Sequence, residues 1–193
     1  MYEFIKGFVA ELTPTYVVID TGSMGYTVNI SLQTYGNIGQ AQQVRLWLHH
    51  IVREDAEQLY GFFDREEREV FRLLVGVSGV GPNTARMVLS SLSSAEVRNA
   101  IQHDDARRLQ SIKGIGLKTA QRIVVDLKDR MGKTLLSGDA GAAQPQSAHQ
   151  EALSALIMLG FAKAPAEKVI QLLIRENTAH TAEQLIKAAL KRL

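Results

Sequence analysis

Two short stretches of this 193-residue chain repeat each other, and the repeat restricts the architecture more than any other feature of the sequence. Residues 77–85 read VSGVGPNTA, and residues 112–120 read IKGIGLKTA. Each copy contains Gly, an apolar residue and Gly in that order, with Thr and Ala following at the same spacing. Because a fixed period indicates a duplicated structural unit, we expect the same local structure to occur twice.

Apolar residues recur at helical spacing before and after each copy, which predicts a helix on either side. Pro82 falls where the second helix of the first copy should begin, a position that suits proline. Each copy is therefore expected to form a helix, a tight Gly-apolar-Gly hairpin and a second helix. Glycine allows the positive φ angle that such a hairpin needs. The N–H groups at the start of the second helix carry a partial positive charge that favours a phosphate.

Each copy resembles the helix-hairpin-helix motif, which binds the DNA backbone without reading its sequence. The alternative is a helix–helix turn that binds nothing, with Lys118 and Arg122 on a solvated helix face. Residues 107–133 hold eight Lys and Arg and only two Asp, which favours phosphate binding. The predicted DNA-contacting residues belong to the two hairpins and the helices after them: Gly79, Val80, Gly81, Asn83, Thr84, Arg86, Gly114, Ile115, Gly116, Lys118, Thr119 and Arg122.

The fold class expected for the whole chain is α+β with several domains. Residues 1–63 alternate like β-strands, with expected strands at 2–9, 16–20, 26–30, 44–52 and 58–62. A short helix capped by Ser31 is expected between the third and fourth strands. Five strands with a helix at this place match the OB-fold barrel. OB-folds often bind nucleic acid through basic and aromatic surfaces, whereas residues 1–62 hold three Lys and Arg against six Asp and Glu.

The turn between the last two strands contains Glu54 and Asp55. One interpretation is a solvated polar turn. A second is that the two carboxylates face DNA, where they would repel phosphates and keep strands apart. A third is a metal-binding nuclease pair, which is disfavoured because no further acidic ligand belongs to a clear motif.

No sequence motif for catalysis is recognisable in the chain. Gly132-Lys133-Thr134 ends like a nucleotide-binding loop, but Leu127 stands where such a loop needs its first glycine. No metalloprotease, hydrolase or triad pattern occurs either, so we expect neither cofactor nor metal. The absence of cysteine fits a reducing compartment. With no long apolar run and no leader pattern near Met1, we expect a cytoplasmic protein without membrane contact.

The second half of the chain is expected to contain a tandem helix-hairpin-helix domain (64–134), a linker (135–148) and a helical tail (149–193). The linker segment is rich in small and polar residues, which is typical of a flexible tether. The tail shows three helical patterns, the first stopped by Gly160, the second started by Pro165 and the third capped by Thr181. This arrangement resembles a ubiquitin-associated (UBA-like) bundle. Its apolar residues are either all structural or partly a docking face.

Barrel, paired hairpins, linker and three-helix tail, in this order, resemble the RuvA family of Holliday junction branch-migration proteins. The segments that carry this resemblance are VREDA at 52–56, LYGF at 59–62, GVGP at 79–82 and GIG at 114–116 followed by KTA at 118–120. The resemblance implies a homotetramer that binds four-way junction DNA, with Glu54 and Asp55 as an acidic pin at the crossover. It also implies that the tail binds the RuvB ATPase, through residues that include Leu156, Leu159 and Phe161, and that the RuvC resolvase shares the junction.

The chain departs from the family pattern at two positions, since Asn83 and Leu117 stand where lysine is common. Arg86, Lys118 and Arg122 are candidates to compensate for the missing charge. Two other functions stay open on the sequence alone. One is a repair enzyme, such as a glycosylase or nuclease, that grips DNA with the hairpins. The other is an interaction scaffold whose OB-fold binds protein or RNA.

Overall fold

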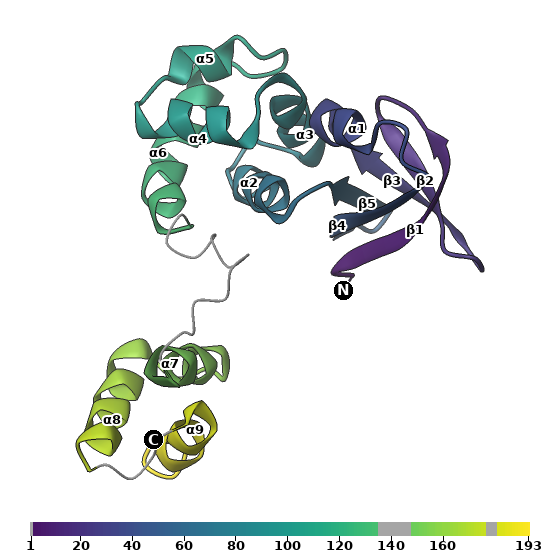
Figure 1. Ribbon diagram of the computed structural model, residues 1–193. Helices are drawn as coiled ribbons and strands as arrows, with labels where there is room; N and C mark the ends of the chain where they lie inside the picture. The colour runs from purple at the N-terminus through teal and green to yellow at the C-terminus, as the bar shows by residue number, and fades with distance from the viewer. Residues whose placement is uncertain (1, 135–147, 177–180) are drawn as a thin grey trace. The chain divides into compact units, whose positions relative to one another are not determined.

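The computed structural model describes residues 2–134, 148–176 and 181–193, and Figure 1 shows its helices and strands. The chain divides into two compact units, with the division after Gly138. The first unit holds the barrel and the helices that follow it, and the second holds the tail. In the described residues, no helix is both long enough and apolar enough to cross a membrane.

Five strands form a closed barrel in the order β1-β2-β3-β5-β4. All neighbouring pairs are antiparallel except β3 and β5, which are parallel. Alternate residues point inward and form an aliphatic core that includes Val17, Ile19, Val28 and Leu46. The strands are β1 (Phe4–Leu12), β2 (Tyr16–Asp20), β3 (Gly25–Ile30), β4 (Gln43–Val52) and β5 (Glu57–Phe62). The predicted OB-fold barrel is confirmed, although β1 begins and ends later than the expected residues 2–9.

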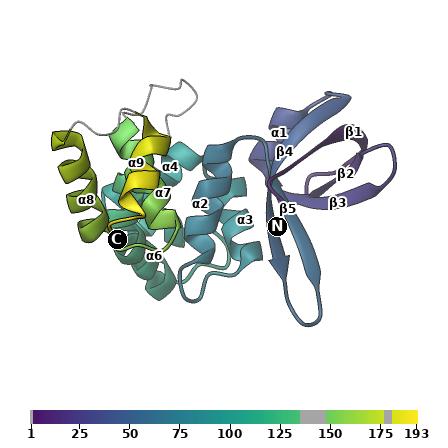
Figure 2. The ribbon, with the colours of Figure 1, turned by 90° about the horizontal axis from the view of Figure 1, so that it is seen from below.

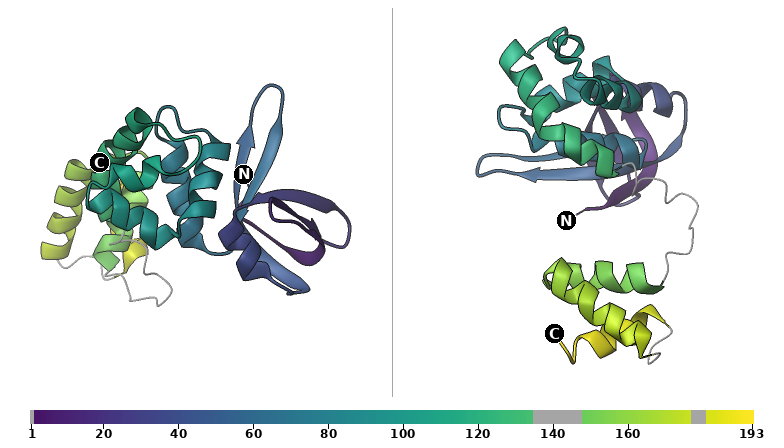
Figure 3. Two further views of the ribbon diagram at one scale, coloured as in Figure 1. Left: turned by 90° about the horizontal axis from the view of Figure 1, so that it is seen from above. Right: turned by 90° about the vertical axis from the view of Figure 1, so that its left-hand side faces the viewer.

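The short helix α1 (Leu32–Ile38) follows β3, and the side chain of Ser31 accepts a hydrogen bond from the backbone N–H of Thr34, as expected for a cap. Strands β4 and β5 continue past the body of the barrel as a hairpin, which projects clearly in Figure 3. The turn at its tip carries Glu54 and Asp55. The barrel therefore holds this acidic turn away from its own core.

Among the described residues of the first unit, five helices follow the barrel: α2 (Arg65–Val75), α3 (Pro82–Ser91), α4 (Ser94–Gln102), α5 (Ala106–Gln110) and α6 (Leu117–Thr134). They enclose one hydrophobic core, to which β5 contributes Tyr60 and Phe62. Both rings pack around Phe71 of α2, with centroid distances of 5.1 Å and 4.8 Å. Helices α2 and α3 lie against the barrel (Figure 2), so the helical region and the barrel share buried surface.

Polar contacts also join α2 to the barrel. The buried carboxylate of Glu67 accepts hydrogen bonds from the hydroxyls of Ser31 and Thr34. Burial raises the pKa of Glu67, and these hydrogen bonds oppose the increase only in part. The neighbouring Arg68 is buried as well and donates to the backbone carbonyl and the carboxylate of Glu3. A buried charge left without partners is costly, so these contacts fix the orientation of α2 on the barrel.

The tail consists of α7 (Ala148–Met158), α8 (Lys163–Arg175) and α9 (Ala182–Ala189) around a small core of its own. Gly160 follows α7 with a positive φ of 97°, which fits the predicted stop. Thr181 caps α9, as predicted, and its cap is a capping box with Gln184. Helix α8 begins at Lys163 rather than Pro165, because proline is accepted throughout the first helical turn and does not mark its first residue.

Candidate nucleic-acid interface

The two hairpins of the repeat have the same backbone geometry. Gly79 and Gly114 have φ angles of 90° and 91°, in the left-handed region that favours glycine. One residue later in each copy, the N–H group donates to the carbonyl three residues earlier, at 3.0 Å for Val80 and 3.1 Å for Ile115. Both of these apolar side chains are buried in the shared core. The buried apolar residue therefore fixes each hairpin to the core, and the glycines of the hairpin lie on the surface.

The second glycine of each copy, Gly81 or Gly116, begins the following helix. Gly81 has an ordinary φ of −82°, and Gly116 is not among the positive-φ glycines. A Cβ atom built on either residue would meet no protein atom within 4 Å. Neither backbone conformation nor packing in this chain therefore demands glycine at these two positions. A bare backbone there leaves room for a ligand to approach the N–H groups at the start of α3 and α6.

Helix α3 has no side-chain cap, so the N–H groups of its first turn are not satisfied from Gly81. The first intrahelical hydrogen bonds of α3 and α6 match, at 2.9 Å each, from Ala85 to Gly81 and from Ala120 to Gly116. Thr84 and Thr119 occupy the same place in the two helices. The structure thus offers two equivalent helix N-termini in one compact unit.

The predicted DNA-contacting cations have different surroundings. Lys118 is exposed and forms no salt bridge with any described residue. Arg122 donates to the backbone carbonyl of Ser78 at 3.3 Å, which links α6 to the first hairpin. Arg86 donates to the carbonyl of Thr15 at 2.9 Å, so it holds α3 against the barrel. Compensation for the missing lysines is therefore most direct through Lys118.

The two departures from the family pattern lie at the surface. The side chain of Asn83 is 3.4 Å from the hydroxyl of Tyr60, a contact between α3 and β5 that the sequence did not reveal. Leu117 is exposed at the first position of α6, beside the second hairpin. Both residues lie where a ligand of the helix N-termini would pass.

The acidic turn is closed by a hydrogen bond from the N–H of Arg53 to the carbonyl of Ala56 at 2.8 Å. Both Glu54 and Asp55 are exposed. Beside the turn, Nε2 of His50 lies 2.7 Å from a carboxylate oxygen of Glu57. No cluster of three or more potential metal ligands occurs within the described residues. The two carboxylates thus stand at a projecting tip with their charge directed to solvent.

In the tail, the three predicted partner-binding residues differ in exposure. Leu156 is fully buried in the core of the bundle, and Phe161 is partly buried against that core. Leu159 is 60% exposed, and its neighbour Met158 is 88% exposed. The position of Leu156 argues for a structural role. Met158 was missed because residues 152–159 are almost continuously apolar, so spacing alone did not separate the outer face from the core.

Three family models match the chain: the RuvA N-terminal domain at residues 1–61, a SAM-like helix-hairpin-helix tandem at 71–129, and the RuvA C-terminal domain at 147–193. The chain belongs to the RuvA family. Curated relatives named Holliday junction branch migration complex subunit RuvA, from Bacteroides fragilis, Christiangramia forsetii and Flavobacterium psychrophilum, are 50%, 47% and 45% identical. Each alignment covers the full length of both chains. The resemblance to the RuvA family seen in the sequence is thereby confirmed.

Proposed function

We propose that this chain is the DNA-binding subunit of a Holliday junction branch migration complex. It binds the backbone of four-way junction arms through its two hairpins, without reading base sequence. The observation that carries this proposal is the pair Gly81 and Gly116, whose lack of a side chain serves neither conformation nor packing within the chain. Close approach of a phosphate to the helix N-termini gives both glycines a purpose.

The hairpin contacts account for affinity but not for a preference for junctions over linear duplex. We assign that preference to a homotetramer whose four-fold symmetry matches four duplex arms. Glu54 and Asp55 of each subunit then stand at the crossover as the acidic pin. Two carboxylates repel nearby phosphates, which favours an open junction with separated strands.

The chain itself is proposed to be non-catalytic. Branch migration needs a source of energy, and residues 127–134 lack the glycine spacing of a nucleotide-binding loop. We therefore assign ATP hydrolysis to RuvB, bound through the exposed apolar face of the tail around Leu159. RuvC is the proposed further partner at the same junction.

The test is a competition gel shift at fixed salt. A labelled four-way junction competes with linear duplex of the same sequences, and a second junction of unrelated sequence serves as the control for base reading. The expected result is strong preference for both junctions over duplex, equal affinity for the two junctions, and no ATP hydrolysis by the purified chain. Equal binding of junction and duplex would reject the junction-specific function. Cleavage of any of these substrates would instead revive the repair-enzyme hypothesis.

A further inference from the structure

The outer face of strands β1 and β4 carries aromatic and cationic side chains in alternation. Phe4 and Trp47 are cross-strand partners, and their rings meet edge to face at 5.9 Å. The guanidinium of Arg45 lies over Phe4 at 4.8 Å, and that of Arg65 from α2 lies over Trp47 at 4.2 Å. We refer to these four residues together with Lys6 as the β1–β4 row.

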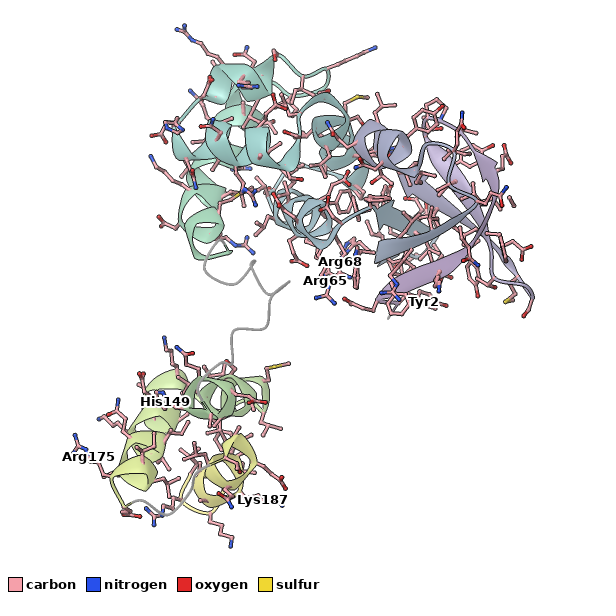
Figure 4. The ribbon with its side chains drawn as sticks, viewed as in Figure 1. Tyr2, Arg65, Arg68, His149, Arg175 and Lys187 are labelled. Carbon is pink, nitrogen blue, oxygen red and sulfur yellow. The ribbon has the colours of Figure 1, made fainter. Side chains whose placement is uncertain are left out.

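The row is basic and largely free of opposing charge. Lys6, Arg45 and Arg65 are all exposed, and none of them forms a salt bridge with a described residue. Glu3, the residue before Phe4, is already paired with the buried Arg68 at 2.8 Å. In Figure 4, Arg65, Arg68 and Tyr2 lie along the same edge of the unit, where α2 meets the strands. The acidic balance of residues 1–62 is therefore not shared by this face.

A shallow hollow of about 210 Å³ opens at the mouth of the barrel and adjoins the row through Phe4 and Lys6. Its lining also includes the aliphatic side chains of Ile5, Leu48 and Leu59, the rings of Tyr2 and Tyr26, and Thr21. Drug-sized ligands occupy pockets of roughly 300–1,000 Å³, so this hollow suits a single ring system. Aromatic rings next to aliphatic side chains favour stacking of such a ring.

The hollow lies at the end of the barrel from which the acidic turn projects. The ring of Tyr2 packs on His50 at 5.2 Å, and Nε2 of His50 lies 2.7 Å from a carboxylate oxygen of Glu57, the first residue of β5. Glu57 and Asp55 are two positions apart in the chain, so their Cα atoms are separated by at most about 7 Å. A strand parted at Glu54 and Asp55 would therefore leave the acidic turn at the same end of the barrel as the hollow.

We propose that the hollow and the β1–β4 row bind a short stretch of unpaired DNA at the crossover, with one base stacked among Tyr2, Phe4 and Tyr26 and the phosphates along Lys6 and Arg45. Aromatic faces and backbone-tracking cations are what sequence-tolerant binding of single strands requires. This inference rests on the proposed junction binding, because that function brings unpaired bases to the acidic turn. The hollow and the β1–β4 row would bind the separated strands, whereas the acidic turn can only repel them.

The matched pair of variants is Phe4→Ala and Phe8→Ala. Both side chains are exposed on β1, at 47% and 57%, but Phe8 neither lines the hollow nor contacts a ring or guanidinium among the described residues. The first measurement is fluorescence anisotropy of a labelled oligothymidylate with the full chain. Loss of one stacked base should weaken binding by about fivefold or more in Phe4→Ala. Phe8→Ala should bind like the unmodified chain.

The second measurement needs no variant. A four-way junction carrying 5-iododeoxyuridine next to the crossover is irradiated in complex with the full chain, and the cross-linked peptide is sequenced. Attachment within residues 2–6 or at Tyr26 is the expected result. Cross-linking elsewhere, or equal oligothymidylate binding by both variants, would overturn the proposal. Since junction-versus-duplex preference is measured separately, its loss would identify failure of the proposed function instead.

The same two variants also test whether a second copy of this chain, rather than DNA, covers the β1–β4 row. If Phe4→Ala lowers the molar mass measured by light scattering while Phe8→Ala does not, the row is a subunit interface and the single-strand proposal is wrong. An unchanged mass with weakened oligothymidylate binding supports the proposal.

Discussion

Replacing Gly81 with alanine gives the sharpest test of the hairpin contacts, because the structure predicts different effects on folding and on binding. A Cβ at Gly81 meets no protein atom within 4 Å, and its φ of −82° suits any residue. Alanine restricts the unfolded chain, which stabilises the fold by about 0.4–1 kcal/mol. Alanine is also a poorer helix cap than glycine, which lowers the free energy of unfolding by a similar amount. The free energy of unfolding should therefore change by less than about 1 kcal/mol.

Binding should respond much more strongly. The added methyl group would stand between the start of α3 and an approaching phosphate. A hydrogen bond to a charged group contributes about 1.5–3 kcal/mol, so losing one should weaken junction binding by about 10- to 150-fold. Gly116→Ala should have a similar effect, because the second copy has the same geometry.

The assay is anisotropy of a labelled four-way junction at constant salt, with thermal unfolding of each variant in parallel. Gly36→Ala in α1 is the matched control, since a Cβ there also meets no atom within 4 Å but lies outside both hairpins. The reasoning is refuted if Gly81→Ala and Gly116→Ala bind the junction as tightly as Gly36→Ala does.

Three further predictions concern other parts of the chain. Replacing Glu54 and Asp55 together by alanine should leave junction binding unchanged or make it tighter, because repulsion of phosphates is removed. The same change should alter branch migration with RuvB. A large loss of junction affinity in a gel shift would contradict the repulsion argument. Leu159→Asp should abolish co-purification with RuvB and keep the helical circular dichroism of the tail, whereas Leu156→Asp should unfold the tail because a charge enters its core. Burial raises the pKa of Glu67 above 4.5, so the folded state holds this proton more tightly than the unfolded state, and stability is lost as pH rises through the raised pKa. Urea unfolding between about pH 5 and pH 8 should therefore show a decrease in stability that is smaller in Glu67→Gln, and identical pH profiles would refute the assignment.

The sequence predicted the hairpins well because their signal is local and occurs twice. Gly79 and Gly114 indicate a positive φ angle, and the apolar residue after each glycine indicates a side chain buried in the core. Both features can be recognised without knowing contacts to distant segments. The barrel was also predictable, since alternation of apolar residues reflects the two faces of each strand. Strand ends were less certain, as for β1, because they depend on cross-strand partners.

Contacts between distant segments were beyond the reach of such patterns. Arg86 was selected for its charge, but the structure directs it to the carbonyl of Thr15, 71 residues earlier in the chain. The partners of Glu67 are Thr34 of α1 and its cap Ser31, 33 and 36 residues away, and no motif joins them to Glu67. Leu156 and Leu159 share a residue type and a helical neighbourhood, and only the packing of α7 on its neighbours separates core from surface.

The single hydrophobic core beneath both hairpins has a mechanical consequence. Val80 and Ile115 are buried in the same core, and Arg122 donates a hydrogen bond to Ser78. These contacts hold the two hairpins at a fixed distance from each other. Every base-pair step of a regular duplex presents the same phosphate spacing to the two hairpins. If the hairpins bind duplex arms as proposed, an arm can rotate and advance by one base-pair step with little change in binding energy, and the motor meets little resistance from these contacts.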